Sequence, residues 1–250
     1  MLGDAALVTV PGMSWPAAIL FDFDGVIVNS EPLHLRAFQE VLRQNGISLS
    51  ADEYYRELIG FDDQGAFRHL FAQHGKPLSP EAFQKLLAAK AATMNRFMAV
   101  GSFSALPGVK ELVIDLAANY PLAICSGALR HEIETMLQGI GLRDYFRIIV
   151  AAEDVTIGKP NPQGYLLTTR LLSEKARIKL RPADCLVIED APTVIRSVKA
   201  AGFRTLAVAT SYPAEALSDA DYVVQTLEPL AMQAMIPEIR LAAGKAPSKA

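Results

Sequence analysis

The sequence has little of what marks a disulfide-rich, nucleic-acid-binding or membrane protein. Its only two cysteines, Cys125 and Cys185, lie in apolar runs, which favours buried thiols in a reducing compartment. Lys and Arg number 24 against 27 Asp and Glu, so there is no basic excess to attract nucleic acid. No uncharged run reaches the roughly 18 apolar residues of a transmembrane helix, and residues 1–11 lack the leading charge of a secretory signal. We expect a cytoplasmic protein without nucleic-acid or membrane partners.

Internal repeats, low-complexity linkers and metal-type Cys/His spacing are also missing. What the chain does have, from about residue 105 onward, is short apolar runs that alternate with helical patterns. The alternation predicts an α/β fold, a doubly wound parallel sheet with helices on both faces. The expected strands are 17–21, 122–125, 148–151, 185–188, 205–209 and 222–224; the helices between them include 130–139, 165–172 and 194–201.

Residues 32–103 follow a different pattern, with helix-type spacing and no convincing strand. Helical stretches are expected at 33–42, 54–59, 66–71 and 83–98. An all-helical block inserted after the first strand predicts a cap over the carboxyl edge of the sheet, where α/β folds bind ligands. We therefore assign 15–31 and 104–235 to an α/β core domain, 32–103 to a helical cap, and 1–14 and 242–250 to flexible tails.

Two aspartates follow the first apolar run, Ala17–Phe21, which is typical of a buried parallel strand. Residues two apart on an extended chain face the same side, so Asp22 and Asp24 leave the sheet edge together, and Gly25 permits a turn. Two carboxylates so close repel each other unless a cation lies between them, and Mg²⁺ prefers such oxygen ligands, often with substrate phosphate. An EF-hand calcium loop is excluded, because its twelfth position would be Leu33 rather than Glu.

Three later motifs also follow apolar runs, and each allows a purely structural interpretation. Ser126-Gly127 offers a hydroxyl and backbone N–H groups to a phosphate, or simply caps the next helix. Lys159, between Gly and Pro, can aim an ammonium at Asp22, or be solvated. Glu189-Asp190 ends a buried strand as metal ligands, or as a helix-dipole cap. All four motifs in this order are hard to obtain by chance.

With these motifs the chain resembles the haloacid dehalogenase superfamily over roughly residues 17–230. It is most similar to the branch with an α-helical cap, which includes phosphoglycolate phosphatases, sugar-phosphate phosphatases and β-phosphoglucomutases. The resemblance implies a Rossmannoid core. It also implies a Mg²⁺-dependent phosphatase that acts on a small phosphorylated metabolite through an aspartyl-phosphate intermediate.

The resemblance also implies a role for each motif residue. Asp22 would be the nucleophile and Asp24 the general acid/base, whose backbone carbonyl touches Mg²⁺ as well. Lys159 would bridge Asp22 and the phosphate. Ser126, with Gly127, would bind phosphate. The metal ligands would be Asp22, Asp24, Asp190 and Glu189, the last in a supporting role.

Two alternatives stay open beside the phosphatase, namely a β-phosphoglucomutase-type phosphotransferase and an inactive binding protein of the same fold. His34 is shared by mutases and many related phosphatases; it either positions Asp24 or substrate, or is a polar hinge residue. Asp63 stands where a mutase is expected to carry an arginine for a second phosphate, and its negative charge favours the phosphatase. Lys90 and Asn95 on the last cap helix are expected to be solvated. We expect a monomer or weak homodimer.

Overall fold

The computed structural model describes residues 15–58, 61, 63–101 and 103–228. The chain divides into two compact units, one made of Met1–Val28 and Ala105–Ala250 and the other of Asn29–Ser104. This division lies a few residues from the boundaries expected between core and cap, an assignment that we keep as a proposal. The expected tails and the core boundary at 235 lie outside the described residues.

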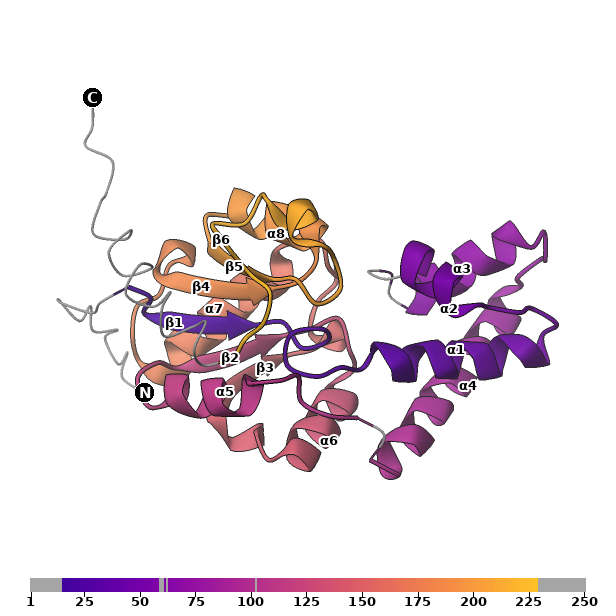
Figure 1. Cartoon of the computed structure of the whole chain (residues 1–250), viewed down its shortest axis with the longest axis horizontal. Coiled ribbons are helices and arrows are strands. Elements are labelled where there is room, and N and C mark those ends of the chain that lie inside the picture. The colour runs from indigo at the N-terminus through magenta and orange to yellow at the C-terminus, as the bar shows by residue number, and fades with distance from the viewer. Residues whose placement is uncertain (1–14, 59–60, 62, 102, 229–250) are drawn as a thin grey trace, which may run out of the picture. The chain divides into compact units, whose positions relative to one another are not determined.

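The first unit contains a six-stranded sheet in the order β3-β2-β1-β4-β5-β6, with every neighbouring pair parallel (Figure 1). The strands are β1 (Ala18–Phe21), β2 (Leu122–Cys125), β3 (Phe146–Val150), β4 (Cys185–Glu189), β5 (Arg204–Val208) and β6 (Tyr222–Val224). The order reverses at β1, because β2 and β4 lie on its two sides. This confirms the predicted doubly wound α/β fold, and the reversal is where such sheets bind ligands.

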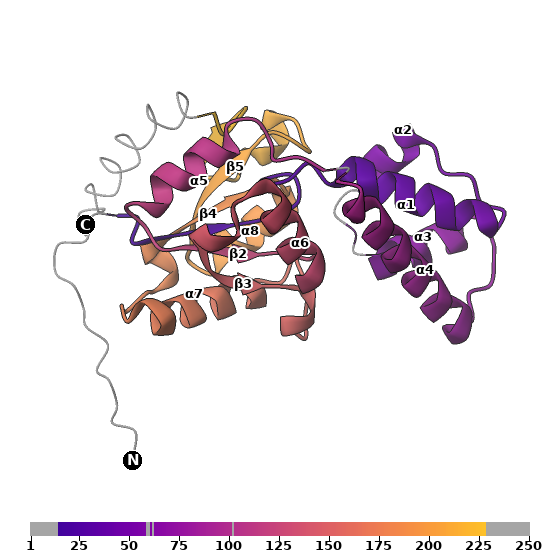
Figure 2. The same ribbon diagram turned by 90° about the horizontal axis from the view of Figure 1, so that it is seen from below.

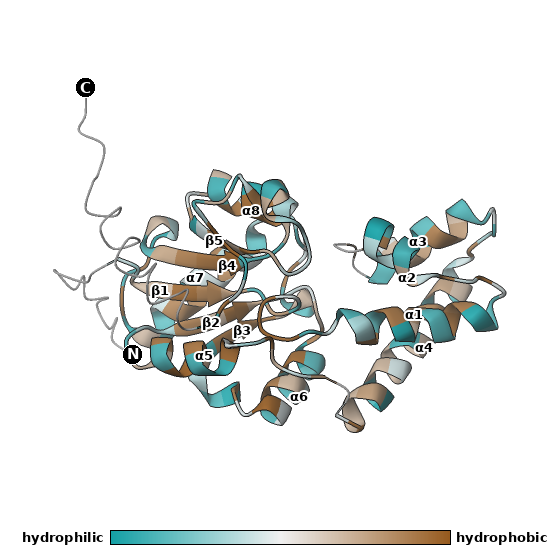
Figure 3. Ribbon diagram, in the orientation of Figure 1, coloured by the Kyte–Doolittle hydropathy of each residue, from teal (hydrophilic) through white to brown (hydrophobic). Residues whose placement is uncertain are grey.

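Helices cover both faces of this sheet. They are α5 (Val109–Ala117), α6 (Arg130–Ile140), α7 (Gln163–Ala176) and α8 (Pro192–Ala200), and Figure 2 shows α5 and α7 on opposite faces. One face presents alternate strand residues, such as Leu20 and Val187, to apolar side chains of α7 and α8. The strands are accordingly mostly hydrophobic (Figure 3).

Several elements differ from their expected bounds by a few residues, and two differences have a clear physical reason. β3 starts at Phe146, two positions before the expected strand, because exposed Arg147 interrupts the apolar pattern without ending the strand. Helix α5 was not expected; it begins after Gly108, whose φ is 77°, and buries Val109, Leu112, Val113 and Leu116. Both cysteines are free and buried, as expected, and burial raises the pKa of each thiol to about 12.

The second unit is helical in its described residues. It contains α1 (Glu31–Gln44), α2 (Ala51–Glu53), a π-helix (Tyr54–Leu58), α3 (Asp63–Gln73) and α4 (Pro80–Ala99). Its own core includes Phe38, Phe67, Leu70 and Phe83. Ser79 caps α4 by accepting a hydrogen bond from the Ala82 backbone N–H at 3.2 Å, and Pro80 follows at the first helical position.

Candidate active site

Strand β1 brings Asp22 to the carboxyl edge of the sheet. All four residues of β1 are buried, and the Asp22 backbone N–H donates to the Ile188 carbonyl at 2.9 Å, which extends the pairing with β4. The Asp22 residue is 8% exposed. Gly25 then turns the chain with a φ of 75°, and its N–H donates to the Val28 carbonyl at 2.9 Å. The resulting loop holds Asp24, which is partly buried.

Strand β4 brings two more carboxylates to the same edge, at the point where the strand order reverses. Glu189 is fully buried and Asp190 is 5% exposed. One oxygen from each of Asp22, Glu189 and Asp190 lies within 4.8 Å of the others. This group does not include the Asp24 carboxylate. The expected contact of Asp24 with the metal is made by its backbone carbonyl, and this contact stays a prediction.

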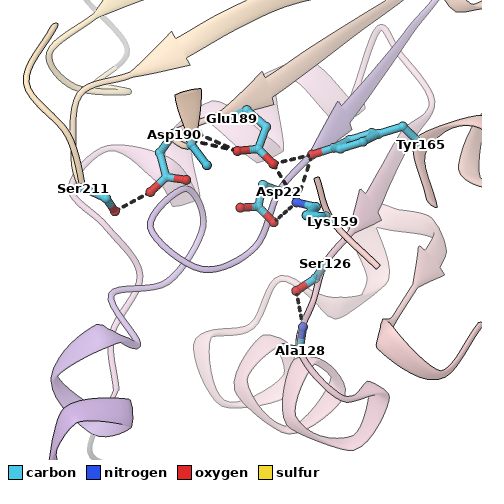
Figure 4. Close-up of polar contacts among 9 residues, drawn as sticks. Asp22, Ser126, Ala128, Lys159, Tyr165, Glu189, Asp190 and Ser211 are labelled. Carbon is cyan, nitrogen blue, oxygen red and sulfur yellow. Dashed lines mark hydrogen bonds and ion pairs between the residues drawn. The ribbon is translucent and has the colours of Figure 1, made fainter. Parts of the chain in front are cut away.

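Lys159 lies among these carboxylates (Figure 4). Its ammonium donates to Asp22 Oδ1 at 2.6 Å, to Glu189 Oε1 at 2.7 Å and to the Tyr165 hydroxyl at 3.2 Å. Burial alone lowers the pKa of Lys159, but Asp22 and Glu189 outweigh it and raise that pKa above its ordinary value. The lysine is therefore a permanent cation held against the nucleophile candidate, and it is not solvated.

The negative charge of this site exceeds the charge of its single ammonium. Burial and then the Glu189 charge raise the pKa of Asp22 to about 7, although Lys159 works in the opposite direction. Burial, Glu189 and Asp22 likewise raise the pKa of Asp190 well above its usual value. Buried carboxylates with raised pKa values are what a divalent cation would stabilise in their ionised form, and oxygen donors suit Mg²⁺. The donor set therefore fits this metal.

The carboxylate of Glu189 is held through both of its oxygens. Oε1 accepts from Lys159 at 2.7 Å and from the Tyr165 hydroxyl at 3.1 Å, and Oε2 accepts from the backbone N–H groups of Asp190 and Ala191, each at 3.0 Å. An ionised carboxylate offers about four lone-pair positions, so the four donors use its capacity. Glu189 thus supports the site, and the oxygens of Asp22 and Asp190 are the better metal ligands.

Asp190 is fixed by two neighbours. The Ser211 hydroxyl donates to its Oδ2 atom. A Cβ atom built on Gly25 would overlap that same Oδ2 and would lie 3.0 Å from Asp190 Cγ. The loop after β1 therefore approaches Asp190 more closely than any residue with a side chain permits.

Ser126 and Gly127 follow β2 at the same sheet edge. The Ser126 hydroxyl oxygen accepts from the Ala128 N–H at 2.9 Å, and the Ser126 N–H donates to the Val150 carbonyl at 2.9 Å. The hydroxyl does not cap α6 in the ordinary sense, because that helix begins after Leu129. A Cβ built on Gly127 would meet no heavy atom within 4 Å, so the turn has open space beside it. Phosphate binding by this turn stays a prediction.

His34 belongs to the helical unit, where it contacts a buried lysine. Lys90 is 1% exposed, and its ammonium donates to His34 Nδ1 at 2.8 Å and forms an ion pair with Asp63. The expectation that Lys90 is solvated is wrong, because helix α4 directs its side chain toward Phe38, with the ammonium 4.8 Å from the ring centroid. Asn95 is exposed, as expected. Burial and the Lys90 charge lower the pKa of His34 well below its usual value, so its imidazole is neutral.

Two residues of the site were missed in the sequence. Tyr165 lies six positions after Lys159, in the first turn of α7, and from the sequence its aromatic ring is interpreted as an ordinary core side chain. Ser211 follows β5, and its neighbour Thr210 donates through its hydroxyl to the Gly25 carbonyl. A search for polar residues within three positions of the end of a buried strand would have found Thr210 and Ser211, since β5 ends at Val208.

Comparison with known proteins agrees with this geometry. The family model described as haloacid dehalogenase-like hydrolase matches residues 19–208, most of the chain. The chain belongs to this family. This confirms the expected superfamily, and the relatives that follow place the chain in the branch of phosphoric monoester hydrolases.

Named relatives in the family include several phosphatases. The chain is 29% identical over 218 residues to validoxylamine A 7'-phosphate phosphatase of Streptomyces hygroscopicus subsp. limoneus, covering 83% of this chain and 92% of the relative. It is 31% identical over 189 residues to fructose-1-phosphate phosphatase YqaB of Escherichia coli, covering 74% and 93%. The crystal structure of CbbY from Rhodobacter sphaeroides in complex with phosphate matches with a TM-score of 0.75 and 26% identity, covering 87% of this chain and 96% of that one.

The described residues contain no helix of the length and apolarity needed to span a bilayer. The expected cytoplasmic location and the oligomeric state stay predictions.

Proposed function

We propose that this protein is a Mg²⁺-dependent phosphatase that hydrolyses a small phosphorylated metabolite through an aspartyl phosphate on Asp22. The observation that carries the proposal is the Lys159 ammonium, 2.6 Å from Asp22 and 2.7 Å from Glu189, beside the carboxylate of Asp190. Phosphoryl transfer depends chiefly on positioning and on stabilising charge at the transferred group, and this cluster provides both.

Asp22 attacks phosphorus in the first step, while Asp24 gives its proton to the departing alkoxide oxygen. Asp24 then takes a proton from a water molecule whose oxygen attacks the acyl phosphate, which releases phosphate and restores both aspartates. Splitting the displacement in this way replaces one difficult step by two easier ones. Lys159 favours the ionised form of Asp22 and meets the charge of the transferring group, and Ser126 and Gly127 bind the oxygens of that group.

Asp22 and Asp190 would hold Mg²⁺ together with the Asp24 carbonyl, and Glu189 would support them. When bound, the ion supplies charge neutralisation that lets an anionic carboxylate approach an anionic phosphoryl group. The site requires it for a simple reason. One ammonium cannot offset three buried carboxylates and a phosphate dianion.

Relatives that act on fructose 1-phosphate and on hexitol phosphates support a hydroxylated small-molecule substrate. The helical unit supports the phosphatase over the mutase, for a reason that differs from simple repulsion. Asp63 pairs with Lys90, and the same ammonium also donates to His34. A cation already matched by a carboxylate is a poor ligand for the second phosphate of a bisphosphate.

Phosphate release from a panel of sugar and polyol phosphates, measured with Mg²⁺ and with a chelator, tests this function. We expect metal-dependent turnover that Asp22→Asn abolishes and Asp24→Asn largely removes. Asp115→Asn, at an exposed position on α5, is the matched control and should keep wild-type activity. Near-normal turnover by Asp22→Asn would rule out the nucleophile. Conversion of β-glucose 1-phosphate to glucose 6-phosphate without free phosphate would show the mutase instead. Absence of phosphate release from every compound, with or without Mg²⁺, would favour the binding protein.

A further inference from the structure

Tyr165 is a core residue with a polar end. It lies in the first turn of α7 and is fully buried, with its ring edge-on to Phe203 at a centroid distance of 6.2 Å. A phenylalanine would fill the same space. A buried phenol is stable only if its hydroxyl has partners, since a buried hydroxyl without a partner loses its hydrogen bonds to water and gains none in return. The partners of this hydroxyl therefore indicate why the position carries tyrosine.

Both partners of the Tyr165 hydroxyl belong to the candidate active site. It accepts from Lys159 Nζ at 3.2 Å and donates to Glu189 Oε1 at 3.1 Å, and Lys159 donates to the same Oε1 at 2.7 Å. The three polar atoms form a closed triangle (Figure 4). The ammonium also lies 5.0 Å from the Tyr165 ring centroid.

The triangle restricts the positions of both charged groups, the Lys159 ammonium and the Glu189 carboxylate. An ammonium has three N–H donors, and those of Lys159 go to Asp22, Glu189 and Tyr165. Glu189 accepts from Lys159 and Tyr165 at one oxygen and from two backbone N–H groups at the other. Removing the Tyr165 hydroxyl would release one donor of Lys159 and one acceptor position of Glu189 at once.

We propose that Tyr165 is a positioning residue, whose hydroxyl fixes Lys159 through Glu189 against Asp22. The inference rests on the proposed phosphatase function. It deepens that function by adding a residue that does not touch the phosphoryl group. Displacement of a charged group by about 1 Å can cost on the order of 10²-fold in rate, and a single hydroxyl restricts such movement only in part. We expect Tyr165→Phe to lower kcat/KM about tenfold, the loss typical of one hydrogen bond to a charged partner.

Tyr120→Phe is the matched control, because it removes the same hydroxyl from a buried tyrosine that precedes β2, at the opposite edge of the sheet. Tyr165→Phe keeps the ring, so its thermal unfolding should stay close to that of the control. A loss of kcat/KM under twofold in Tyr165→Phe, or an equal loss in Tyr120→Phe, would overturn the proposal.

A double-mutant cycle with Glu189→Gln separates positioning from a general packing effect. If the hydroxyl acts through the Glu189 charge, adding Tyr165→Phe to Glu189→Gln should cost less than about twofold, although it costs about tenfold in the wild type. Equal costs in both backgrounds would overturn the proposal. If Glu189→Gln turns over too slowly, the same cycle can be measured with the affinity for inorganic phosphate in the presence of Mg²⁺. Calorimetry would compare the wild type, the two single variants and the double variant.

Failure of the proposed function gives a different result. A wild-type protein that neither releases nor binds phosphate counts against the phosphatase, not against the Tyr165 network. A crystal structure of Tyr165→Phe then decides. Loss of the Lys159 contact with Asp22 or Glu189 supports the positioning role, and retention of both overturns it.

Discussion

Gly25 is the position where one added methyl group should do the most damage to this protein. Its φ of 75° is one that residues with a Cβ rarely adopt. A Cβ there would also overlap Asp190 Oδ2, and it would lie 2.8 Å from Ser211 Oγ and 3.0 Å from Asp190 Cγ. Gly25→Ala therefore combines backbone strain with displacement of a predicted metal ligand.

Gly141 separates these two effects. It has a φ of 76° at the end of α6, and a Cβ there would meet no heavy atom within 4 Å. Gly141→Ala should cost only the left-handed conformation, roughly 1–2 kcal/mol, less roughly 0.4–1 kcal/mol for the stiffer unfolded chain. Gly25→Ala adds an overpacking cost of roughly 1–3 kcal/mol. We expect losses of unfolding free energy of about 1 kcal/mol at Gly141 and about 2–4 kcal/mol at Gly25.

A typical domain has about 5–15 kcal/mol of stability, so both variants should fold and can be compared by urea unfolding. Phosphatase activity should fall on the order of 10²-fold in Gly25→Ala, because Asp190 must move by about 1 Å, and should persist in Gly141→Ala. The half-saturating Mg²⁺ concentration should rise for Gly25→Ala alone. If the two variants match in stability, activity and metal response, the crowding argument is wrong.

Three further predictions concern His34, Lys90 and Ser126. Because the pKa of His34 is well below the usual 6.5, the unfolded chain takes up a proton below that pH while the folded protein does not. Stability should therefore fall as the pH decreases below 6.5, and urea unfolding should show a shallower decrease in His34→Gln; parallel curves would contradict this. Asp63→Ala should cost about 3 kcal/mol by leaving the buried Lys90 ammonium without its carboxylate, whereas Lys90→Met should be nearly neutral. The reverse order of their denaturation midpoints would refute the ion-pair argument. Ser126→Ala should lose about 1 kcal/mol with the Ala128 hydrogen bond and should weaken phosphate binding, so calorimetry with unchanged phosphate affinity would remove Ser126 from the site.

The predictions that succeeded rested on patterns within a single element. The runs that became β2 and β6 were expected at their observed bounds, because a buried parallel strand must be apolar throughout and a polar residue or turn ends it. Lys159 and Asp22 are 137 positions apart, yet their meeting follows from the rule that parallel strands share a carboxyl edge. The helix-type spacing expected within residues 32–103 likewise matches α1, α3 and α4, and the cap assignment stays a prediction.

The failures concern side-chain environments rather than elements. Lys90 shows helical spacing and a charge, which favours solvent, and only the packing of α4 on α1 turns it onto Phe38 and His34. The α5 helix was not predicted although its apolar positions have helical spacing; at nine residues it offers only a short stretch of that pattern.

The order of the apolar runs and the polar residues that end them can be taken from the amino-acid sequence, since secondary structure and the strand edge follow from local pattern. Which oxygen meets which donor depends on the packing of the folded chain. From the sequence, Tyr165 is interpreted as a core residue, Glu189 as a metal ligand and Gly25 as an ordinary turn residue. Their roles depend on close contacts between separate elements, such as those of Glu189 with Lys159 at 2.7 Å and with Tyr165 at 3.1 Å. Such distances are set by how helices and loops pack on the sheet, and spacing along the chain does not encode them.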